Sequence, residues 1–589
     1  MPASQISAAA IHYRVEVADL HAHLFRVTLT VAAPQAQQAL SLPVWIPGSY
    51  LVREFSKNLQ GLRASQGDAS VALVQHDKQR WQVACDSAQP LQVQYEVYAN
   101  DPSVRTASLA ATRGFFNGTS LCLAVEGFTD QPCTLEIIAP EMRAASARIH
   151  CATGLFGLNI DAYGFGVYQA ADYDELVDCP VEIGDFWSGS FEAGGVPHRF
   201  IVAGAAPSFD GERLLADAQK ICAAAIALWH GKDKPPFNNY LFLLNAVHDG
   251  YGGLEHRNST ALICARSDLP RSNAPQTNDG YTTLLGLISH EYFHAWNVKR
   301  LRPSEFARYD YTQENYTELL WFFEGFTSYY DDLLLRRAGL LDDAAYLKLL
   351  TKSVNQVLQA PGRHLQTVAQ ASFDAWVKFY RVDENTPNAT ISYYSKGALV
   401  ALCLDLTLRR DGTSTLDDVM RALWQRCEGG PMAESDLRAV LQALTGRSFD
   451  AEIDAWVHST ADLPLAELLA AHGVALQPET PQPAQRLGLR VSEHHAVQVK
   501  TVLRGGLAER AGMAAGDEWL GIEVDGQGWR INKLEQLALL AGNAAEVTAL
   551  ISRDGRLLRL PLSLSAPADA ASDTVALHLT DAGAVQRWL

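Results

Sequence analysis

The chain has 589 residues, of which 48% are apolar and 19% are charged, a composition typical of ordinary globular domains. One hydrophobic core does not extend over this length, so we expect about three or four domains. The formal net charge of −18 argues against nucleic acid as a partner, because a phosphate-binding surface needs clustered lysine and arginine.

The N-terminal part of the chain, residues 1–168, is predicted to form strands. Apolar and polar residues alternate in HLFRVTLTVAA (residues 23–33) and LQVQYEVYA (residues 91–99), the period of a strand with one buried face. WIPGSY (residues 45–50) is typical of a turn. We therefore expect an N-terminal β-sandwich.

The middle of the chain, residues 169–475, changes from a mixed to a helical pattern. HRFIVAG (198–204) and NYLFLLNAV (239–247) are predicted to be buried strands, and residues 211–231 between them have helical periodicity. From residue 280 onwards, amphipathic runs rich in Ala and Leu predict helices.

The C-terminal part begins with three prolines in QPETPQP (477–483), which predict a stiff, extended linker. Short strands and one helix are predicted over residues 485–566. The tail, residues 567–589, is rich in Ala and Asp, and we expect it to be loosely held. The predicted fold class is multidomain α+β.

The cellular location is predicted from two features. The N-terminus lacks the basic and apolar regions of a secretory signal, and no window approaches the ~18 apolar residues of a membrane span. The nine cysteines are scattered and form no C-x-x-C pair. We interpret them as reduced, mostly buried thiols and expect a cytoplasmic protein that binds no membrane.

A metal site is predicted in GLISHEYFHAWNVKR (286–300), which contains His290, Glu291 and His294 in the pattern His-Glu-x-x-His. On a helix that begins near Asn278, both imidazoles lie on one face and can reach one Zn²⁺ ion. Glu291 can then take a proton from the attacking water. Chance can produce the pattern, but we expect it in the middle of an apolar helix, where such side chains are costly to bury without a partner.

The third ligand is predicted in a second helix, within NYTELLWFFEGFTSYYDDLLLRRAG (315–339). Asn315 and Glu318 have the spacing of a capping box, and Gly339 is a plausible end. Glu324 is the one acid in the aromatic stretch LLWFFEGF, where a carboxylate is costly unless a positive charge neutralises it. A metal ion would do so; an arginine or a backbone partner is the alternative.

HEYFHAWNVKR followed by WFFEGFTSYY resembles the glycyl aminopeptidase family of gluzincin zinc peptidases. Glu324 lies 30 positions after His294, which matches this family better than aminopeptidases of the leukotriene-hydrolase type. The resemblance covers nearly the whole chain, including WIPGSYLVREF (45–55). It implies a thermolysin-like catalytic domain with one Zn²⁺ held by His290, His294 and Glu324, and with Glu291 as the general base.

A substrate-binding motif is expected in GYGGLEHRNST (250–260), which resembles the Gly-x-Met-Glu-Asn motif of zinc aminopeptidases, with Leu for Met and His256 for Asn. The resemblance implies that Gly252 and Gly253 let a backbone edge approach the peptide and that Glu255 binds its α-ammonium. If a carboxylate at a fixed distance from zinc binds the α-ammonium, the first peptide bond lies at the zinc. An ordinary loop at a strand end is the alternative.

A tyrosine is expected to complete the site. ISYYSKGALVALCLDL (391–406) contains Tyr394 in a sequence similar to the family's Tyr-x-Lys-Gly motif, which implies that its hydroxyl hydrogen-bonds the tetrahedral oxyanion. The adjacent Tyr393 could take this role, and either ring could instead pack on the core.

The C-terminal module, beginning with RLGLRV (486–491), resembles a PDZ domain. Such a domain takes a peptide as an added strand and holds its C-terminal carboxylate in a backbone nest, here near residues 487–489. A docked domain that never binds peptide is equally compatible.

We therefore expect a zinc aminopeptidase that acts on peptides and releases small N-terminal residues, Gly or Ala; this preference comes from the resemblance alone. One alternative is an endopeptidase in which Glu255 is structural. Another is a PDZ-bearing peptide-binding protein with a vestigial site, against which the intact His, Glu and Tyr set argues.

Overall fold

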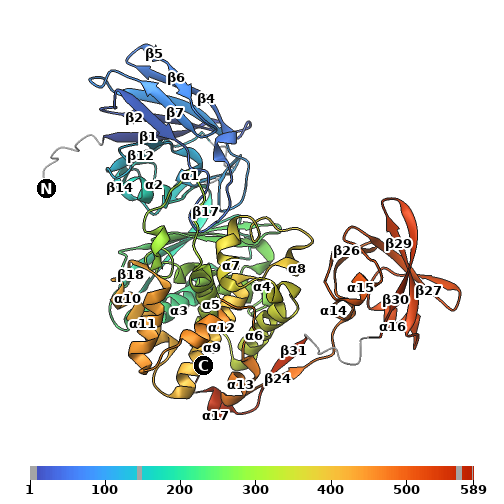
Figure 1. Ribbon diagram of the computed structural model, residues 1–589. Helices are drawn as coiled ribbons and strands as arrows, with labels where there is room; N and C mark the ends of the chain where they lie inside the picture. Colours follow the sequence, from blue (N-terminus) through green and yellow to red (C-terminus); the bar gives the residue numbers. More distant parts are fainter. Residues whose placement is uncertain (1–9, 142–148, 566–573, 587) are drawn as a thin grey trace. The chain divides into compact units, whose positions relative to one another are not determined.

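The computed structural model describes residues 10–141, 149–565, 574–586 and 588–589 (Figure 1). Its contacts divide the chain into two compact units. One unit comprises Met1–Tyr316 and Trp424–Met432, and the other comprises Thr317–Leu423 and Ala433–Leu589. The fold is multidomain α+β, as predicted, with an N-terminal sheet domain, a central helical region and a C-terminal sheet domain.

The N-terminal sheet domain begins the first unit. Its strands run in three sheets, ordered β14-β15-β12-β1-β2-β8-β4-β5, β13-β16-β10-β9 and β11-β3-β7-β6. They are β1 (Ile11–Asp19), β2 (Leu24–Val31), β3 (Gln37–Ser41), β4 (Leu59–Gln66), β5 (Ala69–Val71), β6 (Leu73–Gln75), β7 (Arg80–Ala84), β8 (Leu91–Tyr98), β9 (Ala107–Ala110), β10 (Arg113–Phe116), β11 (Ala124–Val125), β12 (Cys133–Ile137), β13 (His150–Thr153), β14 (Phe156–Ile160), β15 (Gly166–Ala170) and β16 (Val181–Gly184). Short helices η1 (Phe55–Asn58), α1 (Gly118–Leu121) and α2 (Tyr173–Val177) connect them.

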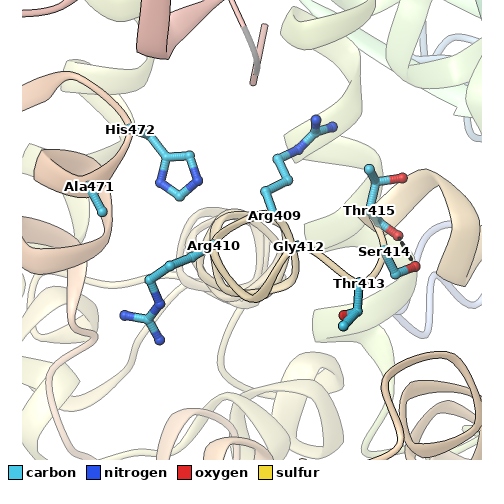
Figure 2. Close-up of a pocket in the computed structure, with 8 residues that line it drawn as sticks. All are labelled: Arg409, Arg410, Gly412, Thr413, Ser414, Thr415, Ala471 and His472. Carbon is cyan, nitrogen blue, oxygen red and sulfur yellow. Dashed lines mark hydrogen bonds between the residues drawn. The ribbon is translucent and has the colours of Figure 1, made fainter.

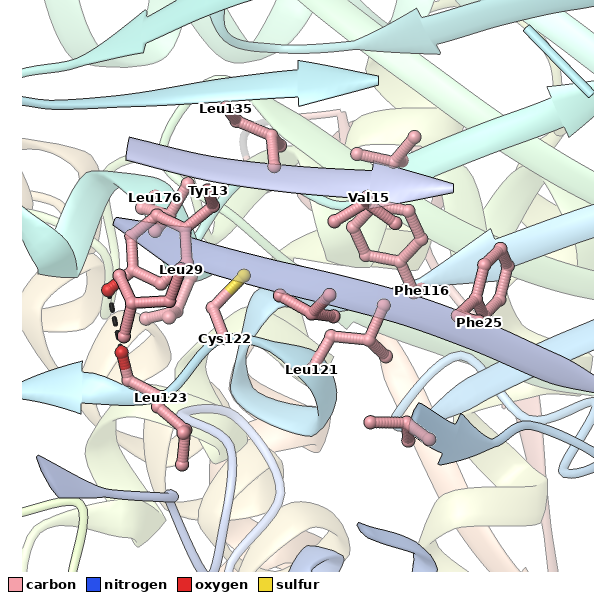
Figure 3. Packing of buried hydrophobic residues seen from close by; sticks show 14 of the residues in the cluster. Tyr13, Val15, Phe25, Leu29, Phe116, Leu121, Cys122, Leu123, Leu135 and Leu176 are labelled. Atoms are coloured by element: carbon pink, nitrogen blue, oxygen red, sulfur yellow. Dashed lines mark hydrogen bonds between the residues drawn. The ribbon is translucent and has the colours of Figure 1, made fainter. Parts of the chain in front are cut away.

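One hydrophobic core joins these sheets. In β2, buried and half-buried residues alternate along the whole strand, as the sequence pattern predicts. Figure 3 shows inward residues of β1 and β2 packed beside Phe116, Leu121 and Leu135. The Tyr13 hydroxyl, buried in this core, donates to the Leu123 carbonyl oxygen at 2.6 Å, which satisfies the polar end of the side chain. Strand β16 pairs with β10 and β13, so this domain continues past residue 168 to Gly184.

A fourth sheet of the first unit has the strand order β17-β18-β19-β21-β20. Its strands are β17 (Phe186–Ala193), β18 (Val196–Ala203), β19 (Tyr240–Val247), β20 (Gly252–Glu255) and β21 (Ser259–Ala265), accompanied by α3 (Gly211–His230) and α4 (Asp279–Phe293). Parallel β18 and β19 flank α3, which confirms the predicted strand–helix–strand segment. Strand β20 pairs antiparallel with β21 and is an edge of this sheet. Short elements complete the unit: η2 (Arg266–Asp268), β22 (Arg302–Pro303), η3 (Ser304–Phe306) and β23 (Pro431–Met432).

The second unit is mainly helical. Its helices are α5 (Leu320–Arg337), α6 (Asp343–Leu358), η4 (Pro361–His364), α7 (Val368–Phe373), η5 (Asp374–Trp376), α8 (Thr386–Ala389), α9 (Tyr393–Asp411), α10 (Leu416–Arg426), α11 (Glu434–Thr445), α12 (Asp450–Trp456) and α13 (Leu465–Ala471). Within the described ranges, no helix combines the length and the apolar character that a membrane crossing requires.

The C-terminal sheet domain has a core of its own around Trp519, Val497 and Ile551. Its sheet is ordered β25-β26-β27-β29-β30, and β28 pairs with β27. The elements are α14 (Pro483–Leu487), β25 (Leu489–Glu493), β26 (Val497–Val502), α15 (Leu507–Arg510), β27 (Glu518–Val524), β28 (Gln527–Arg530), α16 (Gln536–Ala541), β29 (Glu546–Arg553) and β30 (Arg556–Ser563).

The tail is held more firmly than expected. Strand β31 (Val575–Leu579) pairs antiparallel with β24 (Val474–Pro478), and α17 (Ala582–Val585) follows it. Asn355 of α6 donates to the Val575 carbonyl oxygen and accepts from the Val575 amide, both at 2.8 Å. Trp588 is buried against Tyr346. The prediction of a loose tail is therefore wrong for its described residues, and the part before residue 574 lies outside them.

Candidate metal centre and active site

Helix α4 carries the His-Glu-x-x-His motif in its last turn. Asn278 caps the helix, since its side chain accepts from the Tyr281 amide at 2.7 Å, as its residue type predicts. The helix ends at Phe293, so His294 occupies the C-cap position. The expectation of a motif in the middle of the helix was wrong. Because the helix ends there, the backbone after His294 can turn back, and the Asn297 carbonyl oxygen reaches the His294 imidazole.

The two imidazoles are arranged as ligands of one ion. Nδ1 of His294 lies 2.7 Å from the Asn297 carbonyl oxygen, so Nδ1–H donates to it and Nε2 keeps its lone pair. Nε2 of His294 and Nε2 of His290 are 3.1 Å apart. Two nitrogens bound to one tetrahedral Zn²⁺ at ~2.0–2.1 Å have about this separation. The histidines therefore fit zinc.

Glu324 completes this group from helix α5. Its side chain is 1% exposed, and ligand atoms of His290, His294 and Glu324 all lie within 4.8 Å of one another. The three residues therefore form a group that can hold a metal ion, with the N and O donors that zinc takes in proteins.

The start of α5 differs from the prediction. The helix begins at Leu320 after Leu319, with no side-chain cap, so the proposed capping box of Asn315 and Glu318 is wrong. Asn315 lies farther upstream, where its side chain accepts from the Asp310 amide at 2.9 Å. The predicted end is confirmed: Gly339 follows the last turn with φ +71°, the left-handed conformation that glycine adopts at helix ends.

Glu291 lies against the edge strand β20. It is buried, and a Cβ on Gly253 would stand only 2.0 Å from its Oε1 atom. Only a glycine allows the strand to come so close to this carboxylate. At Gly252 a Cβ would meet nothing nearer than Arg105 at 3.8 Å. The close contact at this glycine pair is thus made by Gly253 with Glu291, and the approach of the backbone to a peptide stays a prediction.

Glu255, at the end of β20, belongs to a second group of potential ligands. Its carboxylate, that of Glu291 and a ring nitrogen of His294 lie within 4.8 Å of one another. Two buried carboxylates at this separation repel each other and favour a cation between or beside them. The predicted site residues of α4 and β20 are thus brought together.

Helices α5 and α9 cross at two glycines. A Cβ on Gly325 would stand 2.5 Å from the Gly397 Cα atom, and a Cβ on Gly397 would stand 2.4 Å from the Trp321 carbonyl oxygen. Neither position accepts a side chain. Gly325 follows Glu324 in α5, and Gly397 lies one turn after Tyr394 in α9. The crossing therefore fixes the carboxylate and the phenol relative to each other.

Comparison with known proteins bears on this site directly. Residues 12–185 match the profile of the peptidase M61 N-terminal domain, and residues 283–400 match the M61 glycyl aminopeptidase. A solved structure of an aminopeptidase N family protein from Idiomarina loihiensis is 39% identical, with a TM-score of 0.93 over 98% of this chain and 100% of that one. The chain belongs to the M61 glycyl aminopeptidase family.

The M61 family assignment makes the chain a metallo-aminopeptidase. An M1 zinc metallopeptidase from Deinococcus radiodurans is 14% identical, with a TM-score of 0.48 over 78% of this chain and 95% of that one, a likeness too distant to carry an argument. A comparison with curated proteins gave no match. The M61 match over residues 283–400 contains the metal group and Tyr394.

The two neighbouring tyrosines of this M61 chain have different surroundings. Tyr393 is 0% exposed, whereas Tyr394 is half-buried. The Tyr394 hydroxyl lies 3.3 Å from that of Tyr380. Burial raises the pKa of Tyr394 well above its ordinary value, and the Glu324 carboxylate raises it further. The Tyr394 phenol therefore keeps its proton at neutral pH and can donate it in a hydrogen bond.

A buried charged network lies behind the M61 substrate motif. Nδ1 of His256 is 3.1 Å from Asp178, and the Lys299 ammonium is 2.7 Å from the same carboxylate oxygen. Burial alone would raise the pKa of Asp178, but Lys299 and His256 outweigh it, so this pKa is well below its usual range. His256 thus faces a structural carboxylate. Neither Asp178 nor Lys299 was predicted; a lysine five residues after His294, beside a buried motif, is the signal that could have drawn attention to them.

A cavity of about 500 Å³ in this M61 chain contains none of the predicted site residues. It lies at the C-terminal end of α9, where Figure 2 shows Arg409 and Arg410 leaving the helix in different directions. Arg409 pairs with Asp405 and Arg410 pairs with Glu467, each at 2.9 Å. Because both cations are already neutralised, we assign no ligand to this cavity.

Proposed function

We propose that the chain hydrolyses the first peptide bond of peptides whose N-terminal residue is small, Gly or Ala. The observation that carries this proposal is the group formed by Glu255, Glu291 and His294, whose ligand atoms lie within 4.8 Å of one another. An α-amino nitrogen and the carbonyl carbon of the same residue are only about 2.5 Å apart. The Glu255 carboxylate is therefore close enough to the metal group to bind the α-ammonium of the residue whose peptide bond is cleaved.

In this proposal His290, His294 and Glu324 hold a zinc ion. A bound zinc ion would supply Lewis acidity that polarises the substrate carbonyl and lowers the pKa of water. Glu291, which touches β20 and is buried, accepts a proton from the attacking water and passes it to the leaving amine. Tyr394 keeps its proton and donates a hydrogen bond from its hydroxyl group to the carbonyl oxygen as negative charge develops there.

Substrate binding is proposed along β20. This strand is an edge of its sheet, and an edge has backbone groups available for an extended peptide. Glu255 at its end would pair with the α-ammonium and align the first peptide bond. Internal peptide bonds bring no charge for Glu255, so they are disfavoured.

The metal assignment predicts the zinc content of variants. Purified protein should contain about one zinc per chain by mass spectrometry of the metal. Glu324→Ala should lose it, because two histidines alone bind zinc weakly. The matched control is Glu318→Ala, an exposed acid just before α5, which should keep its zinc. Full zinc occupancy in Glu324→Ala would assign the third ligand to another residue.

Glu255→Gln tests the exopeptidase proposal. The variant keeps the shape of the side chain and removes its charge, so KM for glycine anilide should rise and kcat/KM should fall about tenfold or more, as expected when a charge-assisted hydrogen bond is lost. Slow cleavage of an N-acetylated peptide should stay the same or improve. The measurement is the ratio of kcat/KM for the free and the blocked substrate.

Asp249→Asn is the matched control, since Asp249 is an exposed acid in the loop before β20. Its free-to-blocked ratio should equal that of the wild type. If the wild type already cleaves the blocked peptide as well as the free one, the chain acts as an endopeptidase and Glu255 is structural.

Two further predictions remain proposals. The C-terminal sheet domain is proposed to be PDZ-like and to take a peptide C-terminus beside the edge strand β25 near Gly488, whose φ is +71°. Calorimetric titration with a free and an amidated peptide C-terminus would test this, because only the free carboxylate suits a backbone nest.

A cytoplasmic location is proposed from the nine free cysteines.

A further inference from the structure

The segment between β3 and η1 contains a tight turn. The Ser49 amide donates to the Ile46 carbonyl oxygen at 3.0 Å, which closes a four-residue β-turn. Pro47 and Gly48 are its central residues, and Gly48 has φ +91°. A proline followed by a residue with positive φ is the pattern of a type II turn, which requires glycine at the second position. The sequence WIPGSY thus encodes the shape of this turn.

Residues on either side fix the turn against η3 and the segment that follows it. The Trp45 indole donates to the Asp310 carbonyl oxygen at 2.8 Å, and the Val44 amide donates to the Tyr311 carbonyl oxygen at 2.8 Å. The ring of Tyr50 stacks on Phe306 with centroids 5.8 Å apart. Both Trp45 and Tyr50 are buried. The tip of the turn therefore has little freedom to move.

The tip of the turn meets the carboxylate of Glu255. A Cβ on Gly48 would stand 2.4 Å from both Oε atoms of Glu255, far inside contact distance. The carboxylate therefore rests against the bare Cα of Gly48. Because the obstructing atoms are at the end of a side chain, a methyl group at this position would displace the carboxylate, and it would also strain a backbone that has φ +91°.

We propose that Gly48 is a positioning residue for the aminopeptidase reaction. The turn of the N-terminal sheet domain is a wall of the pocket for the substrate's first residue, and it holds the Glu255 carboxylate at the place where the α-ammonium binds. This inference rests on the proposed function of Glu255. It gives the N-terminal sheet domain a part in substrate selection, because Gly48 covers one side of the Glu255 carboxylate and the α-ammonium must bind from another side.

Gly48→Ala is the test. The added methyl group should displace Glu255, so kcat/KM for glycine anilide should fall about tenfold, mainly through KM. Cleavage of the N-acetylated peptide should not change. Gly67→Ala is the matched control, since Gly67 lies in the same domain with φ +54° and a Cβ there would meet nothing within 4 Å. Its φ is also positive, so the substitution strains the backbone without the collision, and kcat/KM for both substrates should stay unchanged.

A double variant separates this inference from the proposed function. In the Glu255→Gln background the charge is already absent, so Gly48→Ala should change kcat/KM less than about twofold. If Glu255→Gln itself leaves the free-to-blocked ratio unchanged, the proposed function is wrong and the inference with it. If Glu255→Gln lowers the ratio and Gly48→Ala does not, only the positioning role is wrong.

Pro47→Ala provides a second route if Gly48→Ala does not fold. It adds no atoms toward Glu255 and loosens the turn, because proline restricts the backbone. KM for glycine anilide should rise about two- to fivefold, with the blocked peptide unaffected. An unchanged KM for the free-amine substrate in folded Pro47→Ala would then overturn the proposal.

Discussion

Glu291→Gln is expected to retain zinc and to lower kcat by about 10²–10⁴. The carboxylate touches the edge strand β20 at Gly253, and glutamine has the same shape, so the packing there should be preserved. The amide cannot accept a proton from water, however, and the reaction loses its general base. The loss should appear in kcat for glycine anilide, and the zinc content of the variant should match that of the wild type.

The control for Glu291→Gln is Asp279→Asn, which removes an exposed acid from the first turn of the same helix. A charge at this position affects the stability of the helix by a few tenths of a kcal/mol, so kcat should not change. Near-normal turnover in zinc-loaded Glu291→Gln would exclude this residue as the base. Loss of zinc in that variant would instead make Glu291 a ligand.

Tyr394→Phe is expected to lower kcat by about 10²–10³ with little change in KM. The ring stacks on Phe379 at 5.2 Å and on Tyr393 at 4.8 Å between centroids, and phenylalanine keeps both contacts. What the variant loses is a hydroxyl whose proton is retained at neutral pH. A hydrogen bond to the oxyanion forms only in the transition state, which is why kcat falls and KM does not.

Tyr393→Phe is the matched control, one residue away on the same helix. Its side chain is 0% exposed, so it cannot reach a substrate, and kcat should stay within about twofold of the wild type while stability falls by about 1 kcal/mol at most. If Tyr393→Phe has the kinetic effect and Tyr394→Phe has none, the roles of the two tyrosines must be exchanged.

Local sequence patterns predicted the elements that carry the metal group. The polar residues of α4 stand out, and so does Glu324, the one acid in the aromatic stretch LLWFFEGF, because each would be costly in an apolar helix without a partner. Asn278 and Gly339 marked a helix start and a helix end correctly, because capping depends on a few neighbouring residues. Asn315 failed as a cap because its side chain is engaged by Asp310, a competition that residue spacing cannot reveal.

Contacts between segments that are far apart in the chain could not be predicted from the sequence. WIPGSY was recognised as a turn, but nothing in its residues indicates that its tip meets Glu255. The glycine of the Tyr-x-Lys-Gly motif likewise gave no sign of its partner Gly325. In both cases glycine is needed because of another part of the chain, and that part is known only once the fold is known. The tail was misjudged for the same reason: Trp588 and β31 depend on partners far upstream.

The pairing of β24 with β31 makes the C-terminal sheet domain a topological insertion. Pro478 is opposite Val575 in this ladder, so the chain leaves the helical unit and re-enters it at adjacent points. Excising residues 479–574 and joining the two strands by a short hairpin would keep β31 and Trp588 in place. Ending the chain at residue 480 would remove them, together with the bonds from Asn355. A shortened enzyme should therefore tolerate the internal excision better than the terminal truncation, because only the excision keeps β31 and its contacts with α6.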